Sequence, residues 1–341
     1  MRVFDPAFDR TRATSGLLDS RSTSANEKKV RMSVAAQPRI RYGKQVTESI
    51  NQTRVRYVIL FCAALATPFL YAPTWPLLML AAASYALRMF GVEGIYHRYF
   101  SHRAFRCSRP VQFALAVIAA QCGQHGPLWW ASVHRSHHQN VEQPDDPLSP
   151  RQHGLLQSHV GWVWSERHKD TDLDVVPDFA RFPEILWVNR HYTLLMLSGA
   201  FFIWLLAQAG AFGSTVTGGA ALMWGFFLPT ALGVQTVSLV NSIGHFGRLP
   251  GGYRRYDTGD DSVNRPLLAL LTFGGGWHNN HHRYGASARA GFAWYEIDLT
   301  YYILRLMAAL GLISDLRDRL PDDVRDEGGL SSSTTRAGTL R

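Results

Sequence analysis

The sequence predicts an all-α integral membrane protein, with four transmembrane helices in two hairpins and a cytosolic helical cap that holds a histidine-rich metal site. Two observations lead to this fold class. Long apolar runs fill the middle of the chain, between polar ends rich in Ser, Thr, Arg and Asp. Three short segments beside these runs contain eight of the fourteen histidines, more than a single metal ion needs.

The two ends of the chain are predicted to be tails. Residues 1–50 form a basic, disordered N-terminal tail and residues 317–341 a disordered C-terminal tail, which leaves residues 51–316 as the membrane domain. Residues 1–56 contain twelve Lys and Arg against five Asp and Glu, a surplus of seven positive charges. Such a segment before a span favours a cytoplasmic N-terminus. No basic helix with interleaved aromatic residues appears in it, so we expect no nucleic-acid partner.

Four apolar runs are long enough to suggest spans. They cover residues 57–72, 77–95, 192–211 and 220–240. Pro73 and Pro76 break the first pair, and a turn rich in Gly, Ser and Thr at 213–219 breaks the second. The runs are slightly shorter than the roughly 20 residues of an ideal span, but flanking aromatic residues can occupy the interface. The alternative, two buried hairpins of a soluble bundle, would need an unusually large core.

Two further helices and the topology follow from the same reading. Residues 111–122 are apolar but short, which favours a buried or interfacial helix, and residues 294–313 suggest an amphipathic helix against the membrane or the cap. With a cytoplasmic N-terminus, residues 93–191 and 241–341 share one side of the bilayer. Both termini and all the histidine segments are therefore expected in the cytoplasm, at the inner membrane of a bacterium or the endoplasmic reticulum of a eukaryote.

The three histidine segments have metal-ligand spacing. They contain His97 and His102, then His134, His137 and His138, then His278, His281 and His282. Positions i, i+3 and i+4 of an α-helix fall within an arc of roughly 100°, so the second and third sets each share one helical face. His97 and His102 lie roughly 140° apart on an ideal helix. They converge only if the helix ends or distorts between them, or else they address different ions.

A ninth candidate ligand lies where the fourth span ends. His245 follows Asn241 at an i, i+4 spacing. Nine ligands over two ions give four or five each, which leaves room for water or oxygen, and imidazole alone does not choose the metal. The other five histidines stand alone in the sequence and are expected to have ordinary structural roles. Of these, His159 and His168 could also contact substrate.

In this order and spacing the histidine segments resemble the membrane fatty acid desaturases, most closely the acyl-CoA Δ9 (stearoyl-CoA-like) type. The likeness covers roughly residues 55–316 and includes the segments 158–162, 276–282 and 289–298. It implies a non-haem diiron centre whose ligands are the nine histidines, with Asn241 holding a metal-bound water. It also implies insertion of a cis double bond, at Δ9, into a long saturated acyl-CoA chain, with O2 as co-substrate.

The resemblance also implies partners. Two external electrons are needed per turnover, and no haem motif, dinucleotide fingerprint or cysteine cluster appears in the chain, so the expected donor is a separate ferredoxin or cytochrome b5 with a reductase. Ser132, Val133 and Glu166 depart from the charged residues that the family uses for the CoA head group. Arg167 and Lys169 remain as candidate head-group contacts, and an acyl-lipid or carrier-protein substrate stays open. Gly275 replaces a Glu that is common in the family.

Two rival functions start from the same histidines. A diiron fatty acid or alkane hydroxylase shares the histidine-rich membrane design but inserts oxygen into the chain. A non-enzymatic metal transporter would place its ligands inside the spans near the bilayer midplane. Seven of the nine histidines lie in the segments between or after the predicted spans, and His97 and His245 lie just past span ends. The spacing of the histidine segments favours desaturation over hydroxylation.

Overall fold

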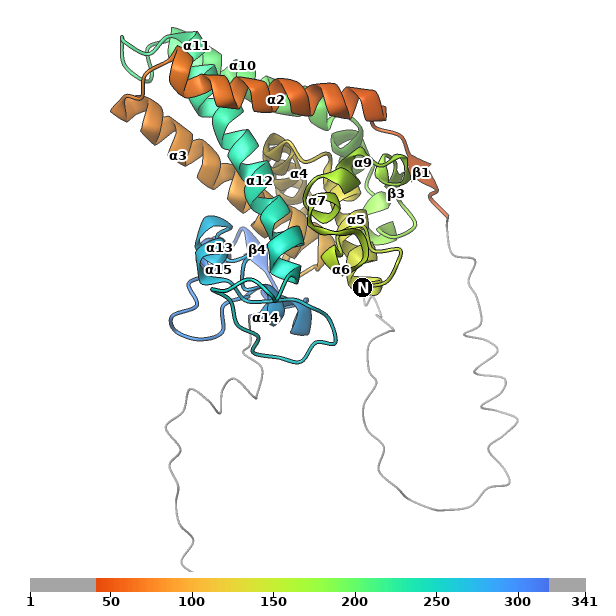
Figure 1. Cartoon of the computed structure of the whole chain (residues 1–341). Coiled ribbons are helices and arrows are strands. Elements are labelled where there is room, and N and C mark those ends of the chain that lie inside the picture. Colours follow the sequence, from red (N-terminus) through yellow and green to blue (C-terminus); the bar gives the residue numbers. More distant parts are fainter. Residues whose placement is uncertain (1–40, 319–341) are drawn as a thin grey trace, which may run out of the picture. The chain divides into compact units, whose positions relative to one another are not determined.

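The computed structural model describes residues 41–318, and the predicted tails fall largely outside these residues. The described chain is mostly helical (Figure 1). The longer helices are α2 (Ile50–Leu70), α3 (Trp75–Phe90), α4 (Arg109–Ala119), α5 (Pro127–Gln139), α9 (Pro183–Arg190), α10 (Tyr192–Gln208), α12 (Leu228–Ser242) and α15 (Leu299–Ala309). Two π-helices, η1 (Gly91–Ser101) and η5 (Met223–Phe227), continue or precede them.

Short elements complete the described chain. The remaining α-helices are α6 (Pro150–His153), α7 (Leu155–His159), α8 (Pro177–Ala180), α11 (Gly218–Leu222), α13 (Pro266–Leu271) and α14 (His278–Arg283). The 3-10 turns are η2 (Ala120–Cys122), η3 (Gly161–Trp164), η4 (Glu166–His168) and η6 (Ile243–His245). Four two-residue strands pair antiparallel as β1 (Lys44–Gln45) with β3 (Thr171–Asp172) and β2 (Arg106–Cys107) with β4 (Ile313–Ser314).

Three helical segments among the described residues are long and apolar enough to cross a membrane: Ile50–Leu70, Trp75–Ser101 and Gly218–His245. A fourth candidate is the pair α9 and α10, whose axes differ by 70° at a short break. The described residues therefore contain four candidate spans if the bent pair counts as one. The second and last of these helices run past the ends expected at 95 and 240. They carry His97 and His245 directly, where the sequence placed both residues just beyond the spans.

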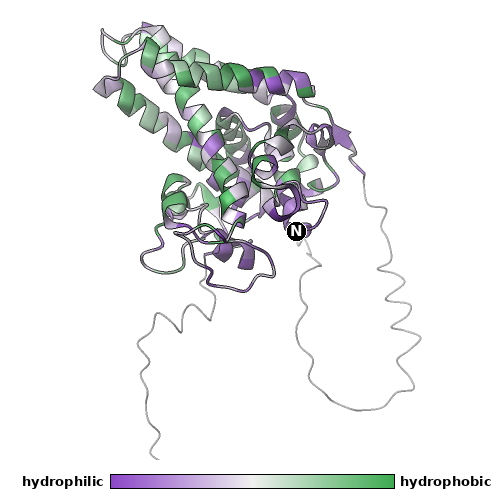
Figure 2. Ribbon diagram, in the orientation of Figure 1, coloured by the Kyte–Doolittle hydropathy of each residue, from purple (hydrophilic) through white to green (hydrophobic). Residues whose placement is uncertain are grey.

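The helices differ in how much of their surface the protein covers. Only 28% of the apolar window of Ile50–Leu70 and 33% of that of Trp75–Ser101 is buried, against 67% for Gly218–His245. Leu65 and Phe69 of α2 are 73% and 88% exposed. Large apolar side chains rarely face water over such lengths, so this surface suits lipid. Gly218–His245 is accordingly the central helix, packed against α2 and α3, and Figure 2 shows the apolar character of these helices.

Both a local helix cap and a long-range strand pairing fix the start of α2. Ser49 and Gln52 form a reciprocal capping box, in which the Ser49 hydroxyl accepts from the Gln52 N–H and the Gln52 side chain accepts from the Ser49 N–H. Just before it, Lys44–Gln45 pairs with Thr171–Asp172, although the sequence placed these residues in the tail. A strand and a helix cap therefore precede residue 51 in the described chain.

The hydrophilic part of the described chain gathers around α5, α14 and the loops between η6 and α14 (Figure 2). The expected helix at 111–122 is present as α4 and η2, and the expected amphipathic helix is present as the shorter α15. Tyr302 and Leu306 on α15 and Leu310 directly after it are 51%, 59% and 65% exposed. This apolar face agrees with a helix that lies against the membrane.

Candidate metal centre

All nine histidines singled out in the sequence converge in two adjacent groups. The five-histidine group consists of His97, His102, His134, His138 and His281. The four-histidine group consists of His137, His245, His278 and His282. Within each group, one ring nitrogen from every imidazole lies within 4.8 Å of all the others. Among the described residues, the other five histidines belong to neither group.

The helices α5 and α14 each supply both groups. His134 and His138 of α5 contact the five-histidine group, whereas His137 turns to the other group. On α14, His281 joins the five-histidine group while His278 and His282 join the four-histidine group. The histidines on the predicted shared face of each helix therefore do not all join one group. Each helix lies between the two groups and contributes histidines to both. Helical spacing alone does not reveal this division.

The π-helix η1 explains how His97 and His102 meet. The N–H of His102 donates to the carbonyl of His97 at 3.1 Å, an i to i+5 hydrogen bond. Such a bond widens the turn, so residues five apart come onto one side of the helix. The ring centroids of His97 and His102 are 5.0 Å apart, and both residues belong to the five-histidine group. The distortion considered from the sequence is therefore present, and the two residues do not address different groups.

Ring nitrogens face one another across both groups. In the five-histidine group the Nε2 atoms of His97 and His281 are 2.9 Å apart, and those of His102 and His134 are 2.8 Å apart. In the four-histidine group the Nε2 atoms of His278 and His245 are 2.8 Å apart, and the Nε2 of His282 is buried without a hydrogen-bond partner. Lone pairs converging at this spacing match adjacent ligands of one ion, which stand about 3 Å apart for bonds of about 2.1 Å.

Burial favours the neutral form of five of these imidazoles by lowering their pKa values. It lowers the pKa of His102 to about 3 and that of His282 to about 4. Burial also lowers the pKa values of His134, His138 and His281 well below the ordinary histidine value, and neighbouring imidazoles add to the effect. A neutral imidazole has a free lone pair, which is the form that binds a metal.

Buried carboxylates hold the outer nitrogen of several imidazoles. The Nδ1 of His137 lies 2.8 Å from Asp146, and that of His282 lies 2.8 Å from Asp260. Such partners fix the tautomer and ring orientation of a ligand. Burial acts to raise the pKa of Asp146, but its hydrogen bonds from His137 and from backbone N–H groups lower it overall. The carboxylate is therefore ionised and a good acceptor.

Two further carboxylates complete this outer layer. Glu93 lies 3.0 Å from the Nδ1 of His97, and Glu142 lies 3.4 Å from that of His245 without hydrogen-bonding geometry. The sequence analysis missed all four acids. Glu93 alone had a local signal, an acid four residues before His97, because Asp146, Asp260 and Glu142 come from loops whose proximity only the fold creates.

The two asparagines inside the third histidine segment anchor α14. The side-chain oxygen of Asn279 accepts from the backbone N–H groups of Arg255 and Tyr256 at 2.8 Å each. The amide of Asn280 donates to Glu296 at 3.0 Å and to the carbonyl of Ala290 at 2.9 Å. Both side chains are fully buried. They fix the orientation of the helix that serves both groups.

A narrow apolar slot leads to the histidines. Trp129, Trp162, Val133 and Val234 line its outer part, which has a volume of about 30 Å³. His134, Trp130, Val237 and Asn241 line both this part and a smaller cavity of about 20 Å³ at His97 and His278. Asn241 thus lies beside both histidine groups. A space of about 30 Å³ has room for a single small molecule and is too small for an acyl chain, so a bound chain would displace the side chains that line the slot.

A wider pocket of about 300 Å³ lies on the other side of Val133. Its lining includes Lys44 and three aspartates, Asp145, Asp170 and Asp172, together with Ser132. The candidate head-group residue Lys169 is near this region but is paired with Glu166 at 2.7 Å. The side chain of Arg167 lies outside the described part of the structure. The charge of the pocket lining is therefore more acidic than basic.

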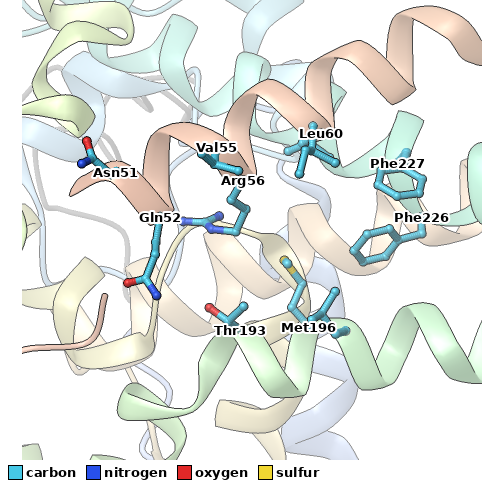
Figure 3. A pocket seen from close by; sticks show the side chains of 11 residues that line it. Asn51, Gln52, Val55, Arg56, Leu60, Thr193, Met196, Phe226 and Phe227 are labelled. Carbon is cyan, nitrogen blue, oxygen red and sulfur yellow. The ribbon is translucent and has the colours of Figure 1, made fainter. Parts of the chain in front are cut away.

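An apolar groove of about 490 Å³ lies apart from these cavities, among α2, α10 and η5 (Figure 3). Val55 and Leu60 line it from α2, and Met196 and Phe226 from the facing helices. Arg56 at one end donates to Tyr192 at 3.0 Å and to Glu48 at 2.8 Å. The groove shares no lining residue with the cavities at the histidines, so it is not the candidate reaction site.

Comparison with known proteins identifies the family to which the chain is similar. The profile described as "Fatty acid desaturase" matches residues 73–313. The chain is 33% identical over 285 residues to an sn-2 palmitoyl-lipid 9-desaturase of Nostoc sp. (strain 36), which covers 80% of this chain and 93% of that protein. It is 32% identical to an acyl-CoA 5-desaturase of Anemone leveillei (80% and 82%) and 32% identical to Delta-9 acyl-lipid desaturase 2 of Arabidopsis thaliana (74% and 78%).

Proposed function

The chain belongs to the fatty acid desaturase family and is therefore an oxygen-dependent oxidoreductase, and on that premise we propose that its nine clustered histidines hold two iron ions. The observation that carries the proposal is the division of these histidines into groups of five and four, with one ring nitrogen of each imidazole lying close to those of the others in its group. When bound, iron would activate O2, the oxidant, which would take two hydrogens from an unactivated alkyl chain and, with two external electrons and two protons, leave as two waters; no side-chain acid or base can do this. Asn241, beside both groups, is positioned to hold a metal-bound water.

The protein's own part in the reaction is to position the acyl chain. We assign this to the slot that runs past Trp129, Trp162 and Val133 to Asn241 and His134. Its apolar walls exclude water, and its depth selects which two carbons lie beside the histidines. A cis double bond at Δ9 is the proposed outcome, supported by 9-desaturases among the relatives; a 5-desaturase of similar identity makes the position a question for product analysis.

The charge beside the slot favours an acyl lipid over an acyl-CoA. The sequence resemblance predicts an acyl-CoA, whose phosphates need Arg or Lys donors. The pocket next to Val133 instead has three aspartates against one lysine, and Lys169 is already paired with Glu166. Two of the relatives named above are acyl-lipid desaturases. We therefore propose a glycerolipid-bound acyl chain as the preferred substrate and acyl-CoA as the weaker one.

The membrane arrangement and electron donor follow from this function. Four spans, with the bent pair α9 and α10 counted as one, would place the histidines and both termini on the cytoplasmic side. A separate ferredoxin or cytochrome b5 with a reductase would deliver two electrons per turnover. Purified protein given substrate, O2 and NAD(P)H alone should show no turnover until such a donor is added.

The decisive experiment is expression of the chain in cells that lack their own desaturase. Mass spectrometry of the lipids would give the position of any new double bond and the lipid class that carries it. New monounsaturated chains are expected, first in glycerolipids. Hydroxylated chains without new double bonds would instead establish the hydroxylase alternative. Metal analysis of protein purified without chelator should return two irons per chain, and one zinc without iron would exclude the diiron centre.

A further inference from the structure

Glu93 is a buried carboxylate that contacts one ligand candidate. It lies on η1, is 4% exposed, and its Oε2 is 3.0 Å from the Nδ1 of His97. The opposite nitrogen of that imidazole, Nε2, faces His281 at 2.9 Å. A carboxylate that accepts from Nδ1–H keeps the proton there and leaves the Nε2 lone pair for a metal. In its ionised form, Glu93 is placed to set both the tautomer and the direction of His97.

The neighbouring Arg98 does not form an ion pair with Glu93, so it does not compete with His97 for this carboxylate. Arg98 donates to Asp298 at 2.8 Å and to the carbonyl of Ala288 at 2.5 Å. Both Arg98 and Asp298 are buried, so their ion pair is a fixed part of the surroundings. Among the described residues, His97 is the hydrogen-bond partner that the structure gives to Glu93.

Gly275 leaves the space that the Glu93 carboxylate occupies. A Cβ on Gly275 would lie 2.2 Å from Oε1, 2.6 Å from Cδ and 2.9 Å from Oε2 of Glu93. All three distances are too short for real contacts. The φ angle of Gly275 is outside the left-handed region, so backbone conformation does not require glycine here. The requirement comes from Glu93, a residue 182 positions away in the sequence.

We infer that Glu93 is the positioning residue for His97 in the five-histidine group, and that Gly275 is its obligate partner. The two positions compete for one buried space, so a carboxylate can enter it from either side but not from both. A short acid at 275 would place its oxygens close to the present Oε2 if residue 93 were small. This inference rests on the proposed metal centre, and it concerns how one half of that centre is held.

The first test measures metal binding to the full-length protein, purified in detergent and stripped of metal. Co²⁺ titration followed by its visible absorption should show two sites in the wild type. Glu93→Leu fills a similar space without an acceptor and should weaken one site about 10- to 100-fold, the range for loss of such a partner. Glu93→Gln keeps a neutral acceptor and should weaken it less. Asp146→Asn is the matched control and should weaken the other site.

The second test exchanges the two positions. Glu93→Ala and Gly275→Asp should each weaken Co²⁺ binding, the first by losing the acceptor and the second by crowding Glu93. The double variant Glu93→Ala with Gly275→Asp should bind more tightly than either single variant. Losses that simply add would overturn the shared-space inference. A wild type with two sites and an unaffected Glu93→Leu would overturn the role of Glu93 alone, whereas a wild type that binds no Co²⁺ would overturn the metal centre and the inference together.

Discussion

The two histidine groups use the same two helices, α5 and α14, but they are supported differently. In the four-histidine group, carboxylates lie beside the Nδ1 atoms of three of the four imidazoles: Asp146, Asp260 and Glu142. In the five-histidine group, the part of the chain that the structure describes places a carboxylate, Glu93, beside only one imidazole of five. The smaller group is therefore held by its surroundings and the larger one by its additional ligands. Orientation by buried acids strengthens each ligand, so fewer ligands suffice.

Loss of a ligand should have the largest effect in either group. His281→Ala opens the five-histidine group and His245→Ala opens the four-histidine group, and each should reduce desaturation by roughly 100-fold or more. Product yield in desaturase-deficient cells, normalised to protein in the membrane, measures this. His153→Ala and His191→Ala, outside both groups, should retain most activity. Wild-type activity in His245→Ala would remove it from the ligand set and leave three histidines in its group.

Loss of a carboxylate should come next and should separate the groups. Asp260 accepts from His282 and also from Ser262 and Thr258, so Asp260→Asn keeps the loop while weakening the partner of His282. The expected loss is about 10- to 100-fold in metal affinity, confined to the four-histidine group. Two-site Co²⁺ titration would show it. Equal weakening of both sites would mean that the groups are not independently supported.

Metal removal should distinguish the groups without any mutation. A chelator added in increasing concentration should take one ion before the other. The first ion to leave is expected from the five-histidine group, because its imidazoles have fewer carboxylate partners. Iron content and activity, measured on the same samples, should show activity lost with the first ion. Simultaneous loss of both ions would contradict the ranking of the two groups.

The smallest effect is expected away from both groups. Glu166 is 64% exposed at its side chain and pairs with Lys169, so water and salt screen this ion pair. Glu166→Arg frees Lys169 and adds a positive charge, so the Michaelis constant for stearoyl-CoA should fall severalfold. Double-bond position and metal content should stay unchanged. An unchanged or higher Michaelis constant across a concentration series would argue against a CoA contact here.

The sequence predicted the parts of the site that are local and missed those that the fold brings together. Ligand identity followed from spacing, because i, i+3 and i+4 residues share a helical face. The sequence could not predict that His137 joins a different group from His134 and His138, because this depends on where a second helix, α14, lies. A helix distortion between His97 and His102 was one of the possibilities that the sequence left open. The sequence could not select it, because the hydrogen bonds of the π-helix depend on packing. The acids Asp146 and Asp260 approach from loops with no periodic pattern.

The fold was predicted in the same uneven way. Apolar runs located the spans because lipid demands continuous hydrophobicity. Their ends were less well placed, since the helices that carry His97 and His245 continue through polar residues whose partners are tertiary. The 70° bend before Tyr192 also escaped prediction. Neither Pro nor Gly lies at that break to signal it.

The length of the helices that extend to the histidines sets how deep the reaction lies. Trp75–Ser101 has 27 residues and Gly218–His245 has 28, and at about 1.5 Å per residue each approaches 40 Å. The hydrocarbon core of a bilayer is about 30 Å thick. On the proposed topology, helices that begin at the far face would carry their last turns, with His97 and His245, about 10 Å beyond the core. The proposed metal centre would then lie at headgroup level, where an acyl tail need rise only a short way and a water-soluble donor could reach it.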